Sequence, residues 1–203
     1  MKEMMKNAGI LLAITIIAGA VLGLVYQTTK DTIAAREEED KKAACLEVFS
    51  DASDFEAVDD YMNETARQKL DDAGYEAEKI NELLVAKDAT GNSIGAVFNV
   101  TTSEGYGGDI TFTVGIRNDG TVNGISILSI NETAGLGMNA DKVLKPQFAN
   151  KNVSLFSYTK TGASSDNEID AISGATITTN AITNGVNCCL TYFYDVLGGG
   201  INE

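Results

Sequence analysis

The chain has 203 residues, enough for one folded domain with an appendage, and it contains neither histidine nor tryptophan. Without histidine the sequence lacks the commonest general base, the Ser-His and Cys-His nucleophile systems and imidazole metal ligands, so we expect no unaided hydrolytic chemistry and assign any chemistry to a cofactor. The net charge of −14 argues against a nucleic-acid partner, because binding to phosphates needs clustered Lys and Arg.

An uncharged apolar run covers residues 8–26, with the sequence AGILLAITIIAGAVLGLVY. As a helix this run rises about 28 Å, which matches a hydrocarbon core of roughly 30 Å. It predicts a single transmembrane helix, with residues 1–26 forming the N-terminal tail and anchor. A cleaved signal peptide is the alternative, because Lys2 and Lys6 form a basic start, but the run is longer than the usual apolar region of about 7–15 residues.

Positive charges flank the run on both sides, so their count does not select an orientation across the membrane. Farther on, Glu37 and Glu38 precede Lys41 and Lys42 by four residues, a spacing that supports a helix. We expect residues 27–82 to form a polar stalk and a helical segment, with one helix near residues 63–73 that stops at Gly74. No functional site is expected there.

Two β-hairpins are predicted to follow in succession. The first pairs residues 83–86 with residues 94–101, and the second pairs residues 109–117 with residues 122–130 across the turn NDG. Four such strands make an antiparallel meander. A short helix around residues 141–148 and a long C-terminal helix can cover one face of this sheet, so the predicted fold class is α+β, with the domain spanning residues 83–203.

Two glycine-rich loops interrupt the predicted sheet. Residues 105–110 read GYGGDI, and residues 131–137 read NETAGLG. Taken alone, each loop is typical of an ordinary turn between strands.

A third motif, DAISGAT at residues 170–176, precedes the predicted C-terminal helix. Thr178 or Thr179 is expected to cap this helix, which would place Thr176 beside its N-terminus. Free backbone N–H groups there favour a phosphate, and Gly174 lets a ligand approach the main chain. A plain capped turn is the alternative. The apolar residues of the helix recur at helical spacing, and they are Ile182, Val186, Cys189, Leu190, Phe193 and Leu197.

The three cysteines, Cys45, Cys188 and Cys189, form no CxxC pair and no recognisable zinc spacing. We interpret the adjacent pair as structural. No metal site is expected.

The three motifs in this order, behind one membrane span, resemble the FMN-binding domain family. This family includes the G subunit of the Rnf electron-transport complex and the C subunit of the sodium-translocating NADH:quinone reductase. Residues 170–176 are similar to its flavinylation motif, residues 105–110 to its Gly-Tyr-x-Gly stretch, and residues 131–137 to its Glu-Thr-Pro-Gly-Leu-Gly loop, although Ala134 stands where proline is usual. The layout resembles the G subunit more closely; the C subunit, typically a longer chain, is the alternative.

The resemblance implies that Thr176 is esterified to the phosphate of FMN by a separate flavin transferase. Backbone groups and Ser173 would hold the phosphate, whereas Asp170 would shape the turn or serve the transferase. The isoalloxazine would lie against the second loop, with Leu136 packed on the ring and Tyr106 as a second wall. The residues expected to bind the cofactor are Tyr106, Glu132, Thr133, Gly135, Leu136, Gly137, Ser173, Gly174, Ala175, Thr176, Ile177 and Thr178.

The function implied is that of a membrane-anchored flavoprotein that relays electrons within an Rnf-type ferredoxin:NAD oxidoreductase coupled to cation translocation. Its partners would be the other membrane subunits of the complex and, during maturation, the flavin transferase. The resemblance further implies a single-pass protein of the cell membrane, with a cytoplasmic N-terminus and an extracytoplasmic domain. No dinucleotide or NTP motif is present, so neither NADH nor ferredoxin is expected to bind this chain directly. The competing hypothesis, a membrane-tethered module without covalent flavin, does not require the Thr176 hydroxyl.

Overall fold

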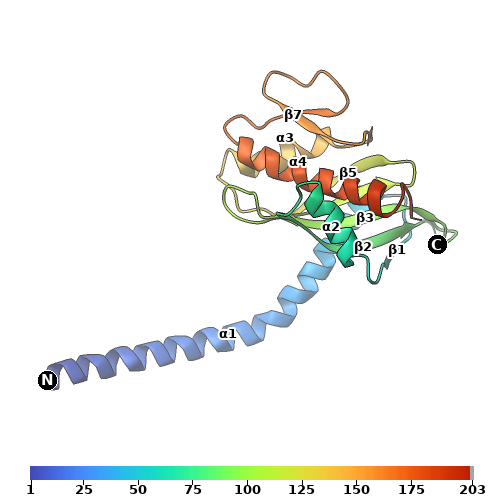
Figure 1. Cartoon of the computed structure of the whole chain (residues 1–203). Helices are drawn as coiled ribbons and strands as arrows, with labels where there is room; N and C mark the ends of the chain where they lie inside the picture. The colour runs from blue at the N-terminus through green and yellow to red at the C-terminus, as the bar shows by residue number, and fades with distance from the viewer. Residues whose placement is uncertain (202–203) are drawn as a thin grey trace. The chain divides into compact units, whose positions relative to one another are not determined.

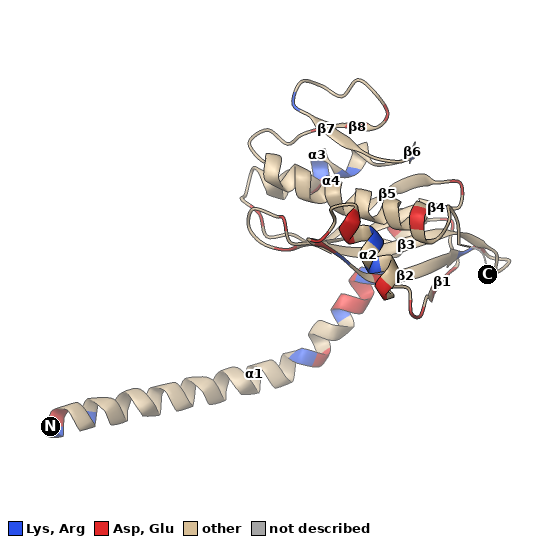
Figure 2. Cartoon of the chain, viewed as in Figure 1, with Lys and Arg blue, Asp and Glu red and all other residues tan. Residues whose placement is uncertain are grey.

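The computed structural model describes residues 1–201 of the chain (Figure 1). It divides into a helical unit, residues 1–40, and a compact unit that begins at Lys41. The first helix, α1 (Lys2–Val48), contains the apolar run. Within the described residues it is the one helix that is long and apolar enough to cross a membrane, judged by length and composition. In Figure 2 the apolar stretch carries no residue coloured as charged, whereas coloured residues occur at the N-terminal end and along the C-terminal part of the helix.

The compact unit contains a six-stranded antiparallel sheet with the strand order β1-β2-β3-β4-β5-β6. A separate parallel pair joins β7 to β8. The strands are β1 (Asp54–Ala57), β2 (Glu78–Lys87), β3 (Ser93–Thr102), β4 (Ile110–Arg117), β5 (Thr121–Ser129), β6 (Lys151–Asn152), β7 (Ser157–Thr159) and β8 (Glu168–Asp170).

The predicted α+β class and the meander from β2 to β5 are confirmed. The expected start of the sheet near residue 83 is wrong, because β1 and the first half of β2 already belong to it. Both segments are rich in charged and polar residues. β1 lies at the sheet edge and exposes most of its side chains, so it lacks the apolar alternation from which a strand is predicted.

The helices of the compact unit agree in part with the predictions. The helix α2 (Glu64–Asp72) begins as expected, with Asn63 as N-cap accepting a hydrogen bond from Ala66 N at 2.9 Å. The short helix expected near residues 141–148 is broken into α3 (Ala140–Val143) and the 3₁₀ turn η2 (Lys145–Gln147), where Pro146 lacks an N–H group to continue the α-helix. Another 3₁₀ turn, η1 (Gly137–Asn139), precedes α3.

The long C-terminal helix α4 (Thr176–Thr191) passes into the π-helical turn η3 (Tyr192–Val196). It contacts β2, β3 and β4 and lies across one face of the sheet (Figure 1). Its predicted apolar face is buried against the strands, and Phe98 of β3 meets Tyr192 edge-on, with ring centroids 5.7 Å apart. The opposite sheet face is covered by residues 44–52, with Phe49 fully buried there. The core therefore fixes α4 and, with it, the motif at its start.

All three cysteines are buried and free, which agrees with the interpretation of the adjacent pair Cys188 and Cys189 as structural. Burial raises the pKa of Cys45 to about 11 and the pKa of Cys188 to about 12. Near neutral pH they therefore stay protonated and unreactive.

Candidate functional site

The three motif loops meet around one cavity of about 550 Å³, a volume usual for small-ligand sites of about 300–1,000 Å³. The first loop follows β3, the second follows β5, and the third leads into α4. The cavity is lined by Tyr106, Glu132, Thr133, Leu136, Gly137, Gly174, Ala175, Thr176, Ile177 and Thr178. Each of these ten residues is among those expected to bind the cofactor, although the chain segments that carry them are far apart in sequence.

The start of α4 differs from the prediction. The helix begins at Thr176 with Ala175 as its N-cap residue and no side-chain cap, so the expected capping by Thr178 or Thr179 is wrong. Instead, the Thr179 hydroxyl donates to Ala175 O at 3.0 Å and accepts from Ile172 N at 3.1 Å. Because Thr179 bonds back to the motif from inside the first turn, it holds residues 172–175 against the helix.

The missing cap leaves backbone donors at the cavity. The first intrahelical hydrogen bond runs from Thr179 N to Ala175 O at 3.0 Å. The N–H groups of Thr176, Ile177 and Thr178 come before it and therefore have no partner within the helix. All three residues line the cavity. The positive end of the helix dipole adds to these donors, so an anionic group of a ligand is stabilised here.

Two hydroxyls complete the polar wall. Thr178 is 1 % exposed, yet among the described residues its hydroxyl has no hydrogen-bond partner. The half-buried Thr176 hydroxyl is likewise unpartnered within the described part of the chain. No side-chain polar atom that is fully screened from solvent lacks a partner in the described residues, so both hydroxyl oxygens are accessible and can bond a polar ligand atom. Apolar side chains that are exposed also line the cavity, and they are Tyr106, Leu136 and Ile177.

Two glycines make this close assembly possible. A Cβ on Gly137 would lie 2.6 Å from the Thr178 hydroxyl oxygen and 2.7 Å from Glu132 Cβ. Gly174 has a φ of +77°, a region that disfavours side chains, and a Cβ there would lie 3.1 Å from Leu136. The second loop therefore packs directly on the start of α4.

Three predicted residues lie outside the cavity lining: Gly135, Ser173 and Asp170. Asp170 anchors its own neighbourhood, because its carboxylate accepts from Ala163 N at 2.7 Å and its backbone N donates to the Gln147 side chain at 2.6 Å. These bonds suit a role in shaping the turn. Ser173 is exposed beside the cavity, and its contact with a phosphate stays a prediction.

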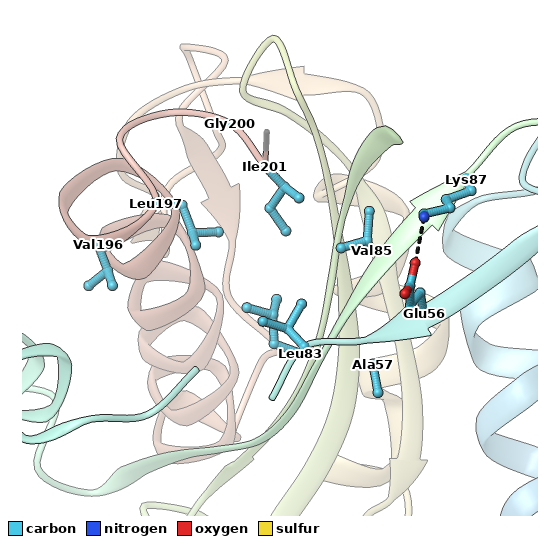
Figure 3. Close-up of a pocket in the computed structure, with 10 residues that line it drawn as sticks. Glu56, Ala57, Leu83, Val85, Lys87, Val196, Leu197, Gly200 and Ile201 are labelled. Carbon is cyan, nitrogen blue, oxygen red and sulfur yellow. Dashed lines mark ion pairs between the residues drawn. The ribbon is translucent and has the colours of Figure 1, made fainter. Parts of the chain in front are cut away.

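A larger hollow of about 660 Å³ lies elsewhere, between the β1–β2 edge and the C-terminal segment. Figure 3 shows Glu56 paired with Lys87 at one side of the hollow, with Leu83, Val85 and Leu197 among its apolar lining residues. None of the predicted site residues lines it. The smaller cavity is therefore the candidate site on account of its backbone donors and unpartnered hydroxyls rather than its volume.

One feature beside the cavity has no signal in the sequence. Glu78, at the start of β2, is 1 % exposed, and burial together with the neighbouring Glu104 raises its pKa to about 7. Glu104 itself immediately precedes the first loop and is half-buried. Glu78 occurs in a polar stretch that resembles a surface segment, so its burial could not be predicted from local pattern.

Comparisons with known proteins identify the family. A family model described as "FMN-binding domain" matches residues 105–191, which contain all three loops, and a model described as "RnfG N-terminal region" matches residues 1–48. These matches define an FMN-binding domain that follows an apolar N-terminal helix.

The chain is 33 % identical to the G subunit of the Na⁺-translocating ferredoxin:NAD⁺ oxidoreductase complex of Acetobacterium woodii, over 96 % of this chain and 94 % of that one. It is 31 % identical to the G subunit of the proton-translocating complex of Clostridium ljungdahlii, over 90 % and 88 %. A crystal structure of the C subunit of Na⁺-translocating NADH-quinone reductase from Parabacteroides distasonis has a TM-score of 0.49, with 18 % identity over 72 % of this chain and 78 % of that one. The chain belongs to the family of G subunits of Rnf-type ion-translocating oxidoreductase complexes.

Replacing Gly137 with Ala is expected to damage the cavity, because the added Cβ would overlap Thr178 and Glu132. We expect several-fold less flavin on the protein purified from its native host and a loss of about 1–3 kcal/mol in the free energy of unfolding. Flavin absorbance per chain and thermal unfolding measure the two effects. Gly200→Ala is the matched control, because a Cβ there meets nothing closer than 3.9 Å. Equal flavin content in the two variants would contradict the assignment of this cavity.

Proposed function

We propose that this chain is a membrane-anchored electron carrier whose FMN is covalently attached to Thr176, within an Rnf-type ferredoxin:NAD oxidoreductase coupled to cation translocation. The observation that carries the proposal is the position of Thr176. It is the first residue of α4, it lines the cavity on which all three loops converge, and its hydroxyl has no partner among the described residues. The relatives from Acetobacterium woodii and Clostridium ljungdahlii are named as subunits of complexes of this kind.

The residues of the cavity suit FMN bound in one orientation, with its phosphate at the start of α4 and its ring at the other two loops. The N–H groups of residues 176–178 and the Ser173 hydroxyl would hold the phosphate. The Thr178 hydroxyl would bond a polar atom of the ligand, and Leu136 and Tyr106 would flank the flat ring. FMN, when bound, supplies reversible transfer of one or two electrons. The chain itself provides no histidine for acid–base catalysis, so its role is to hold and orient the FMN.

Attachment would join the Thr176 Oγ to the phosphorus of the flavin phosphate. The bond that breaks links this phosphate to the leaving group of an activated flavin nucleotide, and the hydroxyl proton leaves with that group. No redox change occurs in this step. A flavin transferase would supply the activated nucleotide, with Asp170 as a residue of the recognised motif. Outside the cytoplasm a flavin held by affinity alone would be lost by dissociation, whereas a phosphoester removes that equilibrium.

Intact mass and in-gel flavin fluorescence of the denatured protein from its native host test the proposal. We expect a mass gain of one FMN residue and fluorescence that survives denaturation. Flavin released on denaturation would contradict covalent attachment and favour the second candidate, a tethered module that binds flavin reversibly. The unpartnered Thr178 hydroxyl fits both candidates, so the mass decides between them.

The apolar run of α1 would span the cell membrane, with the N-terminus cytoplasmic, the compact unit outside and other membrane subunits as partners. Exposed Ser165 in the compact unit and Glu3 in the tail offer two cysteine positions for a test. Because the three native cysteines are buried, background labelling should be low. A membrane-impermeant maleimide added to intact spheroplasts is expected to label Ser165→Cys and to label Glu3→Cys only after the membrane is opened. The reverse pattern would overturn the orientation.

A further inference from the structure

The loop that carries Tyr106 is held at both ends by carboxylates. On one side, Glu104 Oε2 accepts hydrogen bonds from Asn184 Nδ2 at 2.7 Å and from Asn180 Nδ2 at 3.4 Å, both on α4. On the other side, Glu132 Oε1 accepts from Gly107 N at 3.3 Å. Tyr106 lies between these two attachments. Its side chain is 71 % exposed, so packing of that side chain contributes little to the position of the loop. Its place at the cavity therefore depends on Glu104 staying docked on α4.

Glu104 meets a second carboxyl group at this point. The Thr102 hydroxyl donates to Glu78 Oε1 at 3.2 Å and accepts from Glu104 N at 3.3 Å, and the carboxyl groups of Glu78 and Glu104 lie within hydrogen-bonding reach of each other. Two adjacent carboxylates away from water cannot both stay ionised at low cost. A single proton between them replaces the repulsion with a short charge-assisted hydrogen bond.

None of the other ionisable groups around Glu78 neutralises its side chain or competes with it for a proton near neutral pH. The guanidinium of Arg67 on α2 is paired with Asp71 and donates to the backbone carbonyl of Glu78 at 2.8 Å rather than to its side chain. Burial raises the pKa of each remaining neighbour, so these stay neutral near pH 7; they are Tyr75, Cys188 and Cys189. Burial and the charge of Glu104 bring the pKa of Glu78 to about 7.

We infer that Glu78 is protonated and donates a hydrogen bond to the Glu104 carboxylate, and that this bond keeps the Tyr106 loop docked on α4. Glu78 is a positioning residue, because it does not line the cavity. When the proton is lost to solvent, the half-buried Glu104 is the member of the pair that can leave, and the loop moves with it. Only the link to FMN rests on the proposed function; the proton-dependent docking is a property of the chain itself.

Backbone hydrogen exchange of the full chain in detergent, followed by mass spectrometry from mildly acidic to mildly alkaline pH, tests this inference without any need for flavin. In the wild type, the protection of residues 104–108, corrected for the intrinsic rise of exchange with pH, should fall by up to about tenfold per pH unit as the pH rises from 4.5, the ordinary carboxyl value, towards about 7, and should level off above that. Glu78→Gln should keep the loop protected throughout, because the neutral amide still donates to Glu104. Glu76→Gln, an exposed site two residues earlier, should leave the wild-type transition unchanged.

An unchanged transition in Glu78→Gln, or none in the wild type, would overturn the inference. Glu104→Gln provides a second arm that is independent of whether Glu78→Gln folds. It removes the second carboxylate, so the transition should disappear there too, and its persistence would also overturn the inference. This experiment measures exchange in the protein chain and does not depend on flavin. It can therefore be interpreted even if covalent flavin attachment is disproved.

Discussion

Replacing Thr176 with Ala is expected to abolish covalent attachment completely. The variant from the native host should have the mass of the unmodified chain, and its denatured band should show no flavin fluorescence. Alanine removes the hydroxyl that would form the phosphoester, while the backbone donors at the start of α4 remain. The free energy of unfolding should change by less than about 1 kcal/mol, because the Thr176 side chain makes no hydrogen bond among the described residues and alanine is a good helix former.

Two variants serve as controls for Thr176→Ala. Ser173→Ala removes the exposed hydroxyl three residues earlier and is expected to retain attached flavin, though with weaker hold on the phosphate during maturation. Thr176→Ser keeps a hydroxyl at the same place and should retain at least part of the modification. If Thr176→Ala still gained the mass of FMN, the attachment would lie at another residue, and the proposed role of this threonine would be refuted.

Replacing Phe112 with Ala is expected to have the largest effect on stability, a loss of about 3–5 kcal/mol. Phe112 on β4 is fully buried, and α4 sits directly on its ring at Gly185, where a Cβ would lie 2.5 Å from the ring carbon Cζ. The substitution would leave a cavity beneath the helix that begins with Thr176. Flavin attachment should fall along with stability, because the motif depends on where α4 lies.

Chemical unfolding of the full chain in detergent, followed by the near-ultraviolet signal of its tyrosines, measures this loss. Tyr106→Ala is the aromatic control. It removes a side chain that is 71 % exposed, so we expect a change in free energy of unfolding within about 0.5 kcal/mol. A loss below about 1 kcal/mol for Phe112→Ala would mean that α4 is not anchored through this ring.

The lining of the candidate cavity was largely predictable because its residues occur in three short motifs. Each motif carries glycines and hydroxyl-bearing residues that resemble those of a known family, and ten of the expected residues line one cavity. The helix start was mispredicted because Thr178 and Thr179 are both plausible caps by residue type alone. The bond from Ile172 N to Thr179 that decides the matter depends on the fold of the preceding turn.

By itself, the sequence determined the apolar helix, the hairpins from β2 to β5 and the apolar face of α4, because each follows from a pattern repeated over neighbouring residues. The tertiary structure alone decided the edge strands β1 and β6, the unpartnered hydroxyls at the cavity and the meeting of Glu78 with Glu104. These features depend on which distant segments pack together and which side chains they screen from water. Such burial of a single residue produces no periodic pattern in the neighbouring sequence, so it cannot be predicted from that sequence.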